Sequence, residues 1–174
     1  MNNPATPGQT VGPFFGYALP YDGGPDLVPP GHPGSIRLHG YVWDGAGAPV
    51  PDALLEIWQA DAGGLVPQVG GSLRRDGYTF TGWGRASTDN TGHYTFTTIE
   101  PGAPFIALTV FARGLMNRLF TRIYLPAAVD PFLMTVPADR RGTLIAAREP
   151  EGLRFDVVLQ GDGETVFLTY PGQL

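Results

Sequence analysis

Histidine is the side chain that most often acts as acid, base or metal ligand, and this chain has 3 of them. His32 lies in a Pro-Gly segment, while His39 and His93 lie on the polar sides of alternating patterns. Metal centres are usually built from several His, Cys, Asp or Glu side chains within reach of one another, and no such spacing is present. We therefore expect all three histidines to be surface or edge residues without chemistry.

A serine or cysteine nucleophile has equally little support. The chain has no cysteine, and none of Ser35, Ser72 and Ser87 lies in a G-x-S-x-G turn. The glycine-rich segments do not lie between a strand and a helix, where a phosphate-binding loop is found. Asp61 follows an apolar strand pattern, and we interpret it as a residue that caps a turn.

Arg113 stands out because of its position. It directly follows the apolar run 105–112 and precedes Gly114. An arginine at the end of a strand can simply pair with a nearby carboxylate. Alternatively, its planar fork of N–H donors can bind an anion in a pocket. The pattern alone leaves both hypotheses open.

Composition excludes several classes of function. The 174 residues suit one domain, and a hydrophobic content of 43% makes disorder improbable. The net charge is -5 and every cation is an arginine, without a basic tract, so nucleic acid is an improbable partner. No apolar run has the length of a membrane span, and no signal peptide is visible, so we expect a cytoplasmic protein that does not bind membranes.

Short apolar or alternating runs between turn signals predict an all-β fold, a β-sandwich of mixed or antiparallel strands with at most short helical turns. The run 105–112 is predicted to be buried on both faces, the turn 89–92 to close a hairpin, and Pro137 to begin a short helical turn. Strands are expected at 36–43, 53–60, 78–88, 93–99, 105–112, 119–125, 153–160 and 165–170.

Residues 1–34 differ in composition from the rest of the chain. They are rich in proline and glycine and carry four aromatic side chains between residues 14 and 21. A purely solvated tail has little use for so many aromatics. We therefore expect residues 1–34 to form an irregular N-terminal arm that packs on a surface, either the sandwich domain 35–174 or a partner subunit.

Several segments together resemble the intradiol ring-cleaving dioxygenases, over nearly the whole chain and in order. The segments are 6–14 (TPGQTVGPF), 42–64 (VWDGAGAPVPDALLEIWQADAGG), 84–102 (GRASTDNTGHYTFTTIEPG) and 111–126 (FARGLMNRLFTRIYLP). Residues 141–147 and 154–168 are similar, more narrowly, to the alpha chains of the members that cleave protocatechuate. The resemblance implies a β-sandwich and ring cleavage by dioxygen at a non-haem ferric ion held by two Tyr and two His.

The resemblance also implies that this chain has lost the iron ligands. The position of the first Tyr is Val66, that of the second is Ala103-Pro104, and the two His fall at Phe105 and Ala107. None of these side chains offers a lone pair or a phenolate to a metal. The resemblance thus implies that the Fe(III) cofactor lies in a homologous partner, the beta subunit, and that this chain binds no metal.

Other positions acquire a meaning from the same resemblance. In the family, the N-terminal arm of the alpha chain and an interface arginine help to wall the beta chain's substrate pocket. The matching residues here are Thr10, Gly12, Pro13, Phe14 and Arg113. The implied function is that of a non-catalytic alpha subunit in a hetero-oligomer of alpha–beta pairs. The small aromatic diol 3,4-dihydroxybenzoate would be cleaved at the interface to 3-carboxy-cis,cis-muconate.

Two alternatives remain open. The chain could be an iron-bearing intradiol dioxygenase with unusual ligands, which a metal assay on the isolated chain would reveal. It could also be a non-enzymatic β-sandwich binding module, and the partners that co-purify with it would distinguish this case.

Overall fold

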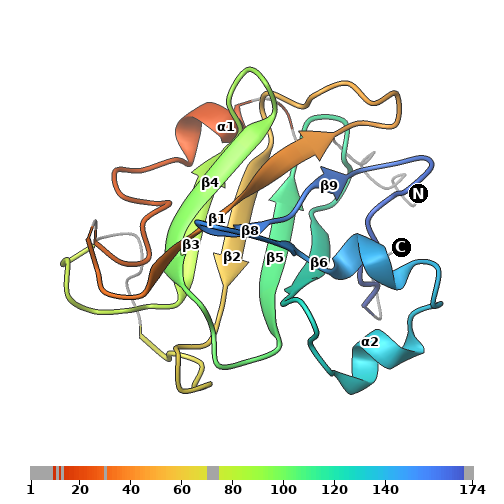
Figure 1. Ribbon diagram of the computed structural model, residues 1–174. Helices are drawn as coiled ribbons and strands as arrows, with labels where there is room; N and C mark the ends of the chain where they lie inside the picture. Colours follow the sequence, from red (N-terminus) through yellow and green to blue (C-terminus); the bar gives the residue numbers. More distant parts are fainter. Residues whose placement is uncertain (1–9, 11, 13, 30, 70–74, 171–174) are drawn as a thin grey trace, which may run out of the picture.

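The computed structural model describes residues 10, 12, 14–29, 31–69 and 75–170, which form two sheets packed face to face (Figure 1). The first sheet has the order β4-β1-β8-β7, with β9 beside β1, and the second has the order β3-β2-β5-β6. Pairs of β1 with β8 and β9 are parallel and the others are antiparallel, which confirms the predicted mixed all-β sandwich. The strands are β1 (Ser35–Trp43), β2 (Leu54–Trp58), β3 (Trp83–Ser87), β4 (His93–Ile99), β5 (Phe105–Phe111), β6 (Leu119–Tyr124), β7 (Ala147–Glu149), β8 (Gly152–Arg154) and β9 (Val157–Val158).

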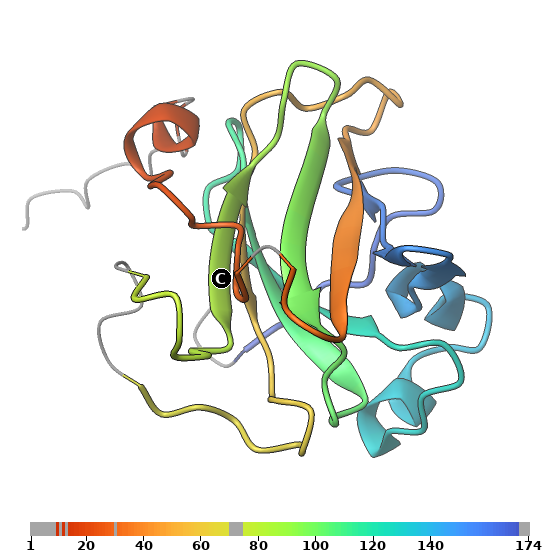
Figure 2. The same ribbon diagram turned by 60° about the vertical axis from the view of Figure 1, so that its left-hand side comes forward.

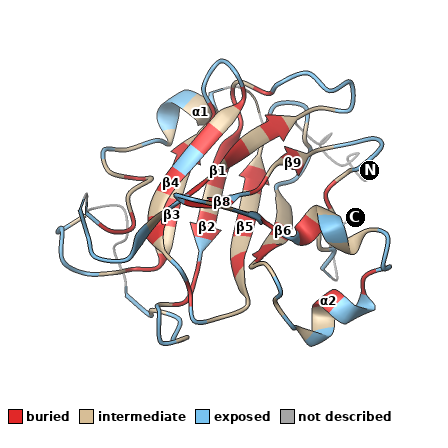
Figure 3. Ribbon diagram, viewed as in Figure 1, coloured by how far each residue is buried: buried red, intermediate tan, exposed pale blue. Residues whose placement is uncertain are grey.

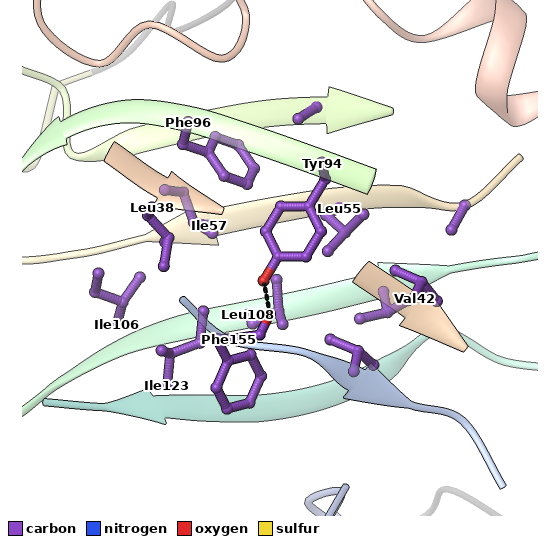
Figure 4. Packing of buried hydrophobic residues seen from close by; sticks show 14 of the residues in the cluster. Leu38, Val42, Leu55, Ile57, Tyr94, Phe96, Ile106, Leu108, Ile123 and Phe155 are labelled. Carbon is purple, nitrogen blue, oxygen red and sulfur yellow. Dashed lines mark hydrogen bonds between the residues drawn. The ribbon is translucent and has the colours of Figure 1, made fainter. Parts of the chain in front are cut away.

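The core lies between the two sheets and follows from side-chain alternation along the strands. Every second residue of β1, β4, β2 and β5 points inward, and these side chains are almost fully buried (Figure 4). The buried phenol of Tyr94 donates a hydrogen bond to the Phe155 carbonyl oxygen at 2.6 Å, which satisfies its hydroxyl within the core (Figure 4). Burial in this apolar layer raises the pKa of Tyr94.

The apolar run 105–112 predicts a strand that is buried on both faces, but β5 is fully buried on only one of them. Ile106, Leu108 and Val110 are buried, but the alternate residues from Phe105 to Phe111 are only half-buried (Figure 3). The outer face of this sheet is covered at its two ends by different parts of the chain. Phe15 stacks on Phe111 at one end, and the segment around α2 (Pro131–Thr135) packs on Phe105 at the other.

Three other expectations about strands need correction. The strand expected at 78–88 is formed only from Trp83, because Gly82 has a φ of 69° that interrupts an extended chain. The run 153–160 divides into β8 and β9, since the Asp156 side chain, rather than a main-chain group, accepts the Tyr41 N–H at 3.1 Å. Residues 165–170 contribute only an isolated bridge, between Phe120 and Leu168.

Two connections also differ from expectation. The turn at 89–92 does not close a hairpin, because β3 and β4 belong to different sheets. The short helix α2, which was not predicted from the sequence, begins at Pro131 because the Asp130 side chain caps it by accepting from the backbone of Phe132 and Leu133. The helical turn predicted at Pro137 is confirmed, since Arg140 N and Arg141 N both donate to the Pro137 carbonyl oxygen, and it leads into the short 3-10 helix Arg141–Leu144. No helix in the described part of the chain is long and apolar enough to cross a membrane.

The arm packs on the sandwich itself from Leu19 onward (Figure 2). Arg85 anchors it by donating to the Leu19 carbonyl oxygen at 2.9 Å, while the same guanidinium pairs with Glu56 at 2.6 Å. Tyr21 stacks on Trp83 with their ring centroids 6.1 Å apart. Before this anchor, the short helix α1 (Phe15–Ala18) lies at the end of the sheet where β5 finishes.

Candidate functional site

The residues singled out from the sequence fall at opposite ends of β5. Arg113 lies two residues after the last residue of the strand, Phe111, and Pro104 precedes the first. At about 3.3 Å per residue, a strand of this length separates its two ends by roughly 20 Å. We call the first end, with Phe14, Phe15, Asp52, Phe111 and Arg113, the arm end. The second, with Phe105, Ala107, Arg122, Tyr124 and Asp130, is the ligand end.

At the arm end, the N-terminal arm contacts the last residue of β5, two positions before Arg113. Phe15 stacks almost parallel on Phe111, with an interplanar angle of 15° and ring centroids 5.9 Å apart. Gly16 approaches the turn before β2 so closely that a Cβ there would lie 3.3 Å from the Asp52 carbonyl oxygen. α1 is therefore seated on the residues that flank Arg113.

The predicted arm residues differ in how far they are covered. Phe14 is 74% exposed, Thr10 is exposed and Gly12 is half-buried. Pro13 lies outside the described residues. Tyr17, which the resemblance did not single out, is 81% exposed on the same helix. The arm end thus presents aromatic surface next to a cation.

Arg113 forms an ion pair with Asp52, with 3.3 Å between Nε and Oδ2. The structure therefore supports the simpler of the two sequence hypotheses, a strand-end arginine beside a carboxylate. Nevertheless, 61% of the Arg113 side chain is exposed while only 8% of Asp52 is. Among the described residues, none forms a hydrogen bond with the Arg113 guanidinium, so its Nη groups remain available to an anion.

The ligand end contains the positions expected to have lost iron ligands. Val66 is 50% exposed in the loop after β2, and Phe105 and Ala107 lie half-buried on the outer face of β5. This loop meets the turn before β5, because Gly102 N donates to the Asp61 carbonyl oxygen at 2.8 Å. The structure therefore brings the loop of Val66 close to the segment that holds Ala103 and Pro104.

Asp61 itself confirms the interpretation of a turn cap. Its Oδ1 accepts from the backbone N–H groups of Gly63 and Leu65, both at 2.9 Å. These two hydrogen bonds fix the start of the loop.

A guanidinium occupies the centre of the ligand end. Arg122 is the cross-strand neighbour of Ala107, whose small side chain leaves room for it. Its Cζ lies 4.2 Å from the Phe105 ring centroid and 4.6 Å from that of Phe132. A cation between two aromatic faces is stabilised by both quadrupoles.

Polar groups complete the environment of this guanidinium. Arg122 Nη1 lies 3.1 Å from the Tyr124 hydroxyl and 3.4 Å from Asp130 Oδ1, and that hydroxyl donates to Oδ1 at 2.8 Å. Burial raises the pKa of Tyr124. Burial also opposes ionisation of Asp130, but its hydrogen bonds and Arg122 hold the pKa of this carboxyl below its usual value. Arg122, Tyr124 and Asp130 therefore form a network in which each polar group is bonded to another.

The ligand end does not fit a ferric ion. Valine, proline, phenylalanine and alanine at the expected ligand positions provide no side-chain donor atom, and Arg122 places a positive charge beside Phe105 and Ala107. Among residues 10–170 that the structure describes, no group of three or more His, Asp or Glu side chains could hold a metal ion.

A cluster of two histidines, which was not predicted from the sequence, lies on the outer face of the other sheet. His39 Nε2 lies 2.8 Å from Glu149 Oε2, and His39 Nδ1 lies 3.3 Å from His93 Nε2. Arg37 Nη2 lies 3.4 Å from the same His93 nitrogen, so a positive charge stands beside the atom that a metal would need. Burial and Arg37 lower the pKa of His93, which favours the neutral ring. Two alternating strands signalled the two outward histidines, but only their register could show the contact.

Comparison with known proteins connects this geometry to a family. The profile of a family described as Dioxygenase matches residues 11–134. The protocatechuate 3,4-dioxygenase alpha chain of Burkholderia cepacia is 40% identical over 93% of this chain and 95% of its own length. The beta chain from the same organism is 34% identical, over 75% of this chain and 66% of its own length. The dioxygenase domain of a carbohydrate-binding fusion protein from Streptomyces sp. SirexAA-E superposes with a TM-score of 0.55 at 28% identity, over 79% of this chain and 87% of that one.

Proposed function

Because the chain belongs to the intradiol ring-cleaving dioxygenases, we propose that it is the alpha subunit of a protocatechuate 3,4-dioxygenase and completes the substrate pocket of an iron-bearing beta subunit. The observation that carries this proposal is the contrast along β5. The ligand end is filled by the chain's own side chains, while the arm end exposes a cation and aromatic rings.

The first part of the proposal is that this chain holds no iron. The absence of donor atoms at Val66, Pro104, Phe105 and Ala107 supports it, as does the Arg122 guanidinium beside them. The ferric ion bound by the beta subunit would supply the chemistry with dioxygen. The residues of this chain would bind and orient the substrate and keep water out of the pocket.

The second part concerns recognition of the substrate. Protocatechuate carries a carboxylate para to one of its two hydroxyls, and an anion in a partly desolvated pocket needs a cation or strong donors. The exposed Nη groups of Arg113 can provide a bidentate contact. Arm residues from Thr10 to Phe14 would form the wall beside it. Ring cleavage between the two hydroxyl-bearing carbons then gives 3-carboxy-cis,cis-muconate.

The third part concerns the partner. A relative of the beta-chain type exists alongside one of the alpha-chain type in the same organism, which supports a hetero-oligomer of alpha–beta pairs. Phe14 and Tyr17 expose 74% and 81% of their surface at the arm end. Clustered exposed aromatic surface is typical of protein–protein interfaces.

Co-expression with a homologous chain that carries the tyrosine and histidine ligands tests the proposal. We expect iron to be absent from the isolated chain, and we expect the co-purified heteromer to contain one ferric ion per alpha–beta pair with its visible tyrosinate-to-iron absorption. One tightly bound iron per isolated chain would instead establish an unusual iron-bearing dioxygenase. A stable monomer that never associates with the homologue would point to a separate binding module.

A further inference from the structure

We infer that Asp52 is a positioning residue, whose carboxylate holds the Arg113 guanidinium with its Nη groups toward the carboxylate of the substrate. This inference rests on the proposed function. Sequence reasoning did not single out Asp52, and its role emerges only from its contacts in the folded chain.

Taken alone, the buried carboxylate of Asp52 lowers the stability of the fold, because it loses its hydration. Only 8% of it is exposed, and its Oδ1 atom is buried with no hydrogen-bond partner among the described residues. Buried carboxylates are normally satisfied by several donors, and a neutral side chain of the same shape would avoid the desolvation penalty. The ion pair with Arg113 is its one polar contact in the described part of the chain.

The backbone around Asp52 is rigid. The buried Thr88 Oγ1 donates to the Val50 carbonyl oxygen at 2.7 Å and accepts from Ala53 N at 3.0 Å, which pins the turn on both sides of Asp52. On the other side, α1 touches the same turn through Gly16. Asp52 therefore joins the arm and Arg113 through a fixed point of the sandwich.

Asp52 contacts the guanidinium of Arg113 on its Nε side, opposite to the side that would bind a substrate carboxylate. Its carboxylate contacts Nε, at 3.3 Å, and leaves the two Nη groups to other partners. An exposed arginine loses considerable rotamer freedom when it binds an anion, and holding it beforehand reduces that loss. A rigidly held carboxylate at Nε would thus orient the two Nη groups of Arg113 before the substrate binds.

Asp52 also has an opposing effect, which makes the inference testable. Its negative charge weakens the attraction of Arg113 for an anionic substrate. If neutralising Arg113 were its main effect, Asp52→Asn would strengthen binding of protocatechuate. If positioning dominates, the same substitution weakens binding. The direction of the change in KM therefore distinguishes the two effects.

The experiment compares Asp52→Asn, Asp52→Ala, Arg113→Ala and the double variant Asp52→Asn/Arg113→Ala in the co-expressed heteromer, with protocatechuate and with catechol. We expect Asp52→Asn to raise the KM for protocatechuate about 3- to 10-fold, with little change in kcat or in the KM for catechol. The double variant should be no worse than Arg113→Ala alone, because both remove the same interaction. Asp139→Asn, which changes the charge equally at an exposed residue, is the matched control.

The outcomes separate this inference from the proposed function. If Arg113→Ala discriminates between the two substrates but Asp52→Asn leaves KM unchanged or lowers it, Asp52 is not a positioning residue and the proposed function stands. If Arg113→Ala itself affects both substrates equally, reading of the carboxylate by Arg113 and the inference about Asp52 are both wrong. If Asp52→Asn and Asp52→Ala chiefly dissociate the heteromer or lose iron, Asp52 is structural, which also overturns the inference.

Discussion

The arm end and the ligand end belong to the same sheet but differ in how completely their charged groups are used. At the ligand end, Arg122 lies between two aromatic rings and within 3.4 Å of Asp130, and its side chain is 27% exposed. At the arm end, Arg113 is 61% exposed, and its partner Asp52 has a buried oxygen without a hydrogen bond to any described residue. Within the part of the chain that the structure describes, the polar groups of the ligand end are paired with one another and those of the arm end are not.

The incompletely paired charges of the arm end indicate where a partner would bind. Polar groups buried in a folded chain are nearly always satisfied, so a charged group with unused bonding capacity indicates a contact outside the chain. The ligand end, which the resemblance connects with iron, forms a small satellite core with Leu133, Val136 and Leu144. The arm end has exposed aromatic side chains and an exposed arginine, which are typical of a surface that meets another molecule.

The largest effect on stability is expected at the ligand end. Arg122→Ala removes a cation from two aromatic faces and leaves the capping carboxylate Asp130 without its charge partner. The free energy of unfolding should fall by about 2 kcal/mol, measured by urea denaturation, with KM for protocatechuate in the heteromer unchanged. Arg118→Ala, which removes a guanidinium that lies over Phe120, is the control and should have a much smaller effect. A rise in KM for Arg122→Ala would mean that the ligand end takes part in binding.

A smaller loss of stability, with the opposite kinetic pattern, is expected at the arm end. Phe15→Ala removes the stack on Phe111 and should lower the free energy of unfolding of the isolated chain by about 1 kcal/mol. Because the arm would lose its packing contact with β5 and no longer be held beside the substrate, KM should rise for protocatechuate and catechol alike. Phe15→Leu, which preserves apolar contact, should recover most of both quantities. Unchanged kinetics in Phe15→Ala would place the arm away from the substrate.

The smallest effect belongs to neither end but to the histidine cluster on the other sheet. Burial, Arg37 and His39 lower the pKa of His93 while Asp89 and Asp156 raise it, and the net result lies below the ordinary value of about 6.5. The unfolded chain therefore binds more protons below that pH, and the free energy of unfolding should fall as the pH decreases from about 7.5 to 5.5.

Thermal unfolding across this range tests the assignment. His93→Gln should make the pH dependence shallower, and His32→Gln, at an exposed turn, should preserve it. Equal slopes in the wild type and His93→Gln would show that other groups cause the acid sensitivity. Substrate affinity attributed to Arg113 should not follow the same titration.

Local sequence patterns predicted much of this molecule. Alternation along 36–43 and 93–99 identified two strands, and Asp61 was correctly interpreted as a turn cap. These features depend on neighbours in sequence. The prediction that the apolar run 105–112 is buried on both faces was wrong. Its outward side chains are covered only at the two ends of the strand, and this cover depends on where the arm and α2 pack.

Contacts between distant segments could not be predicted from the same patterns. Asp52 and Arg113 meet because β2 and β5 are neighbours with Leu54 opposite Phe111. His39 and His93 meet through the pairing of β1 with β4, and Arg122 lies beside Ala107 through the pairing of β5 with β6. Each contact depends on a strand register that the order of residues along the chain does not show.

The specificity of the assembled enzyme for protocatechuate over catechol, measured for Arg113→Ala, tests the central claim most directly. Loss of a charge-assisted hydrogen bond worth about 1.5–3 kcal/mol predicts a rise of roughly 10- to 150-fold in the KM for protocatechuate. Catechol, which has no carboxylate, should be affected much less, iron content and assembly should remain intact, and Arg113→Lys should recover only part of the loss. An equal change for both substrates, or dissociation of the heteromer without altered kinetics, would show that Arg113 only stabilises the interface and would contradict the account.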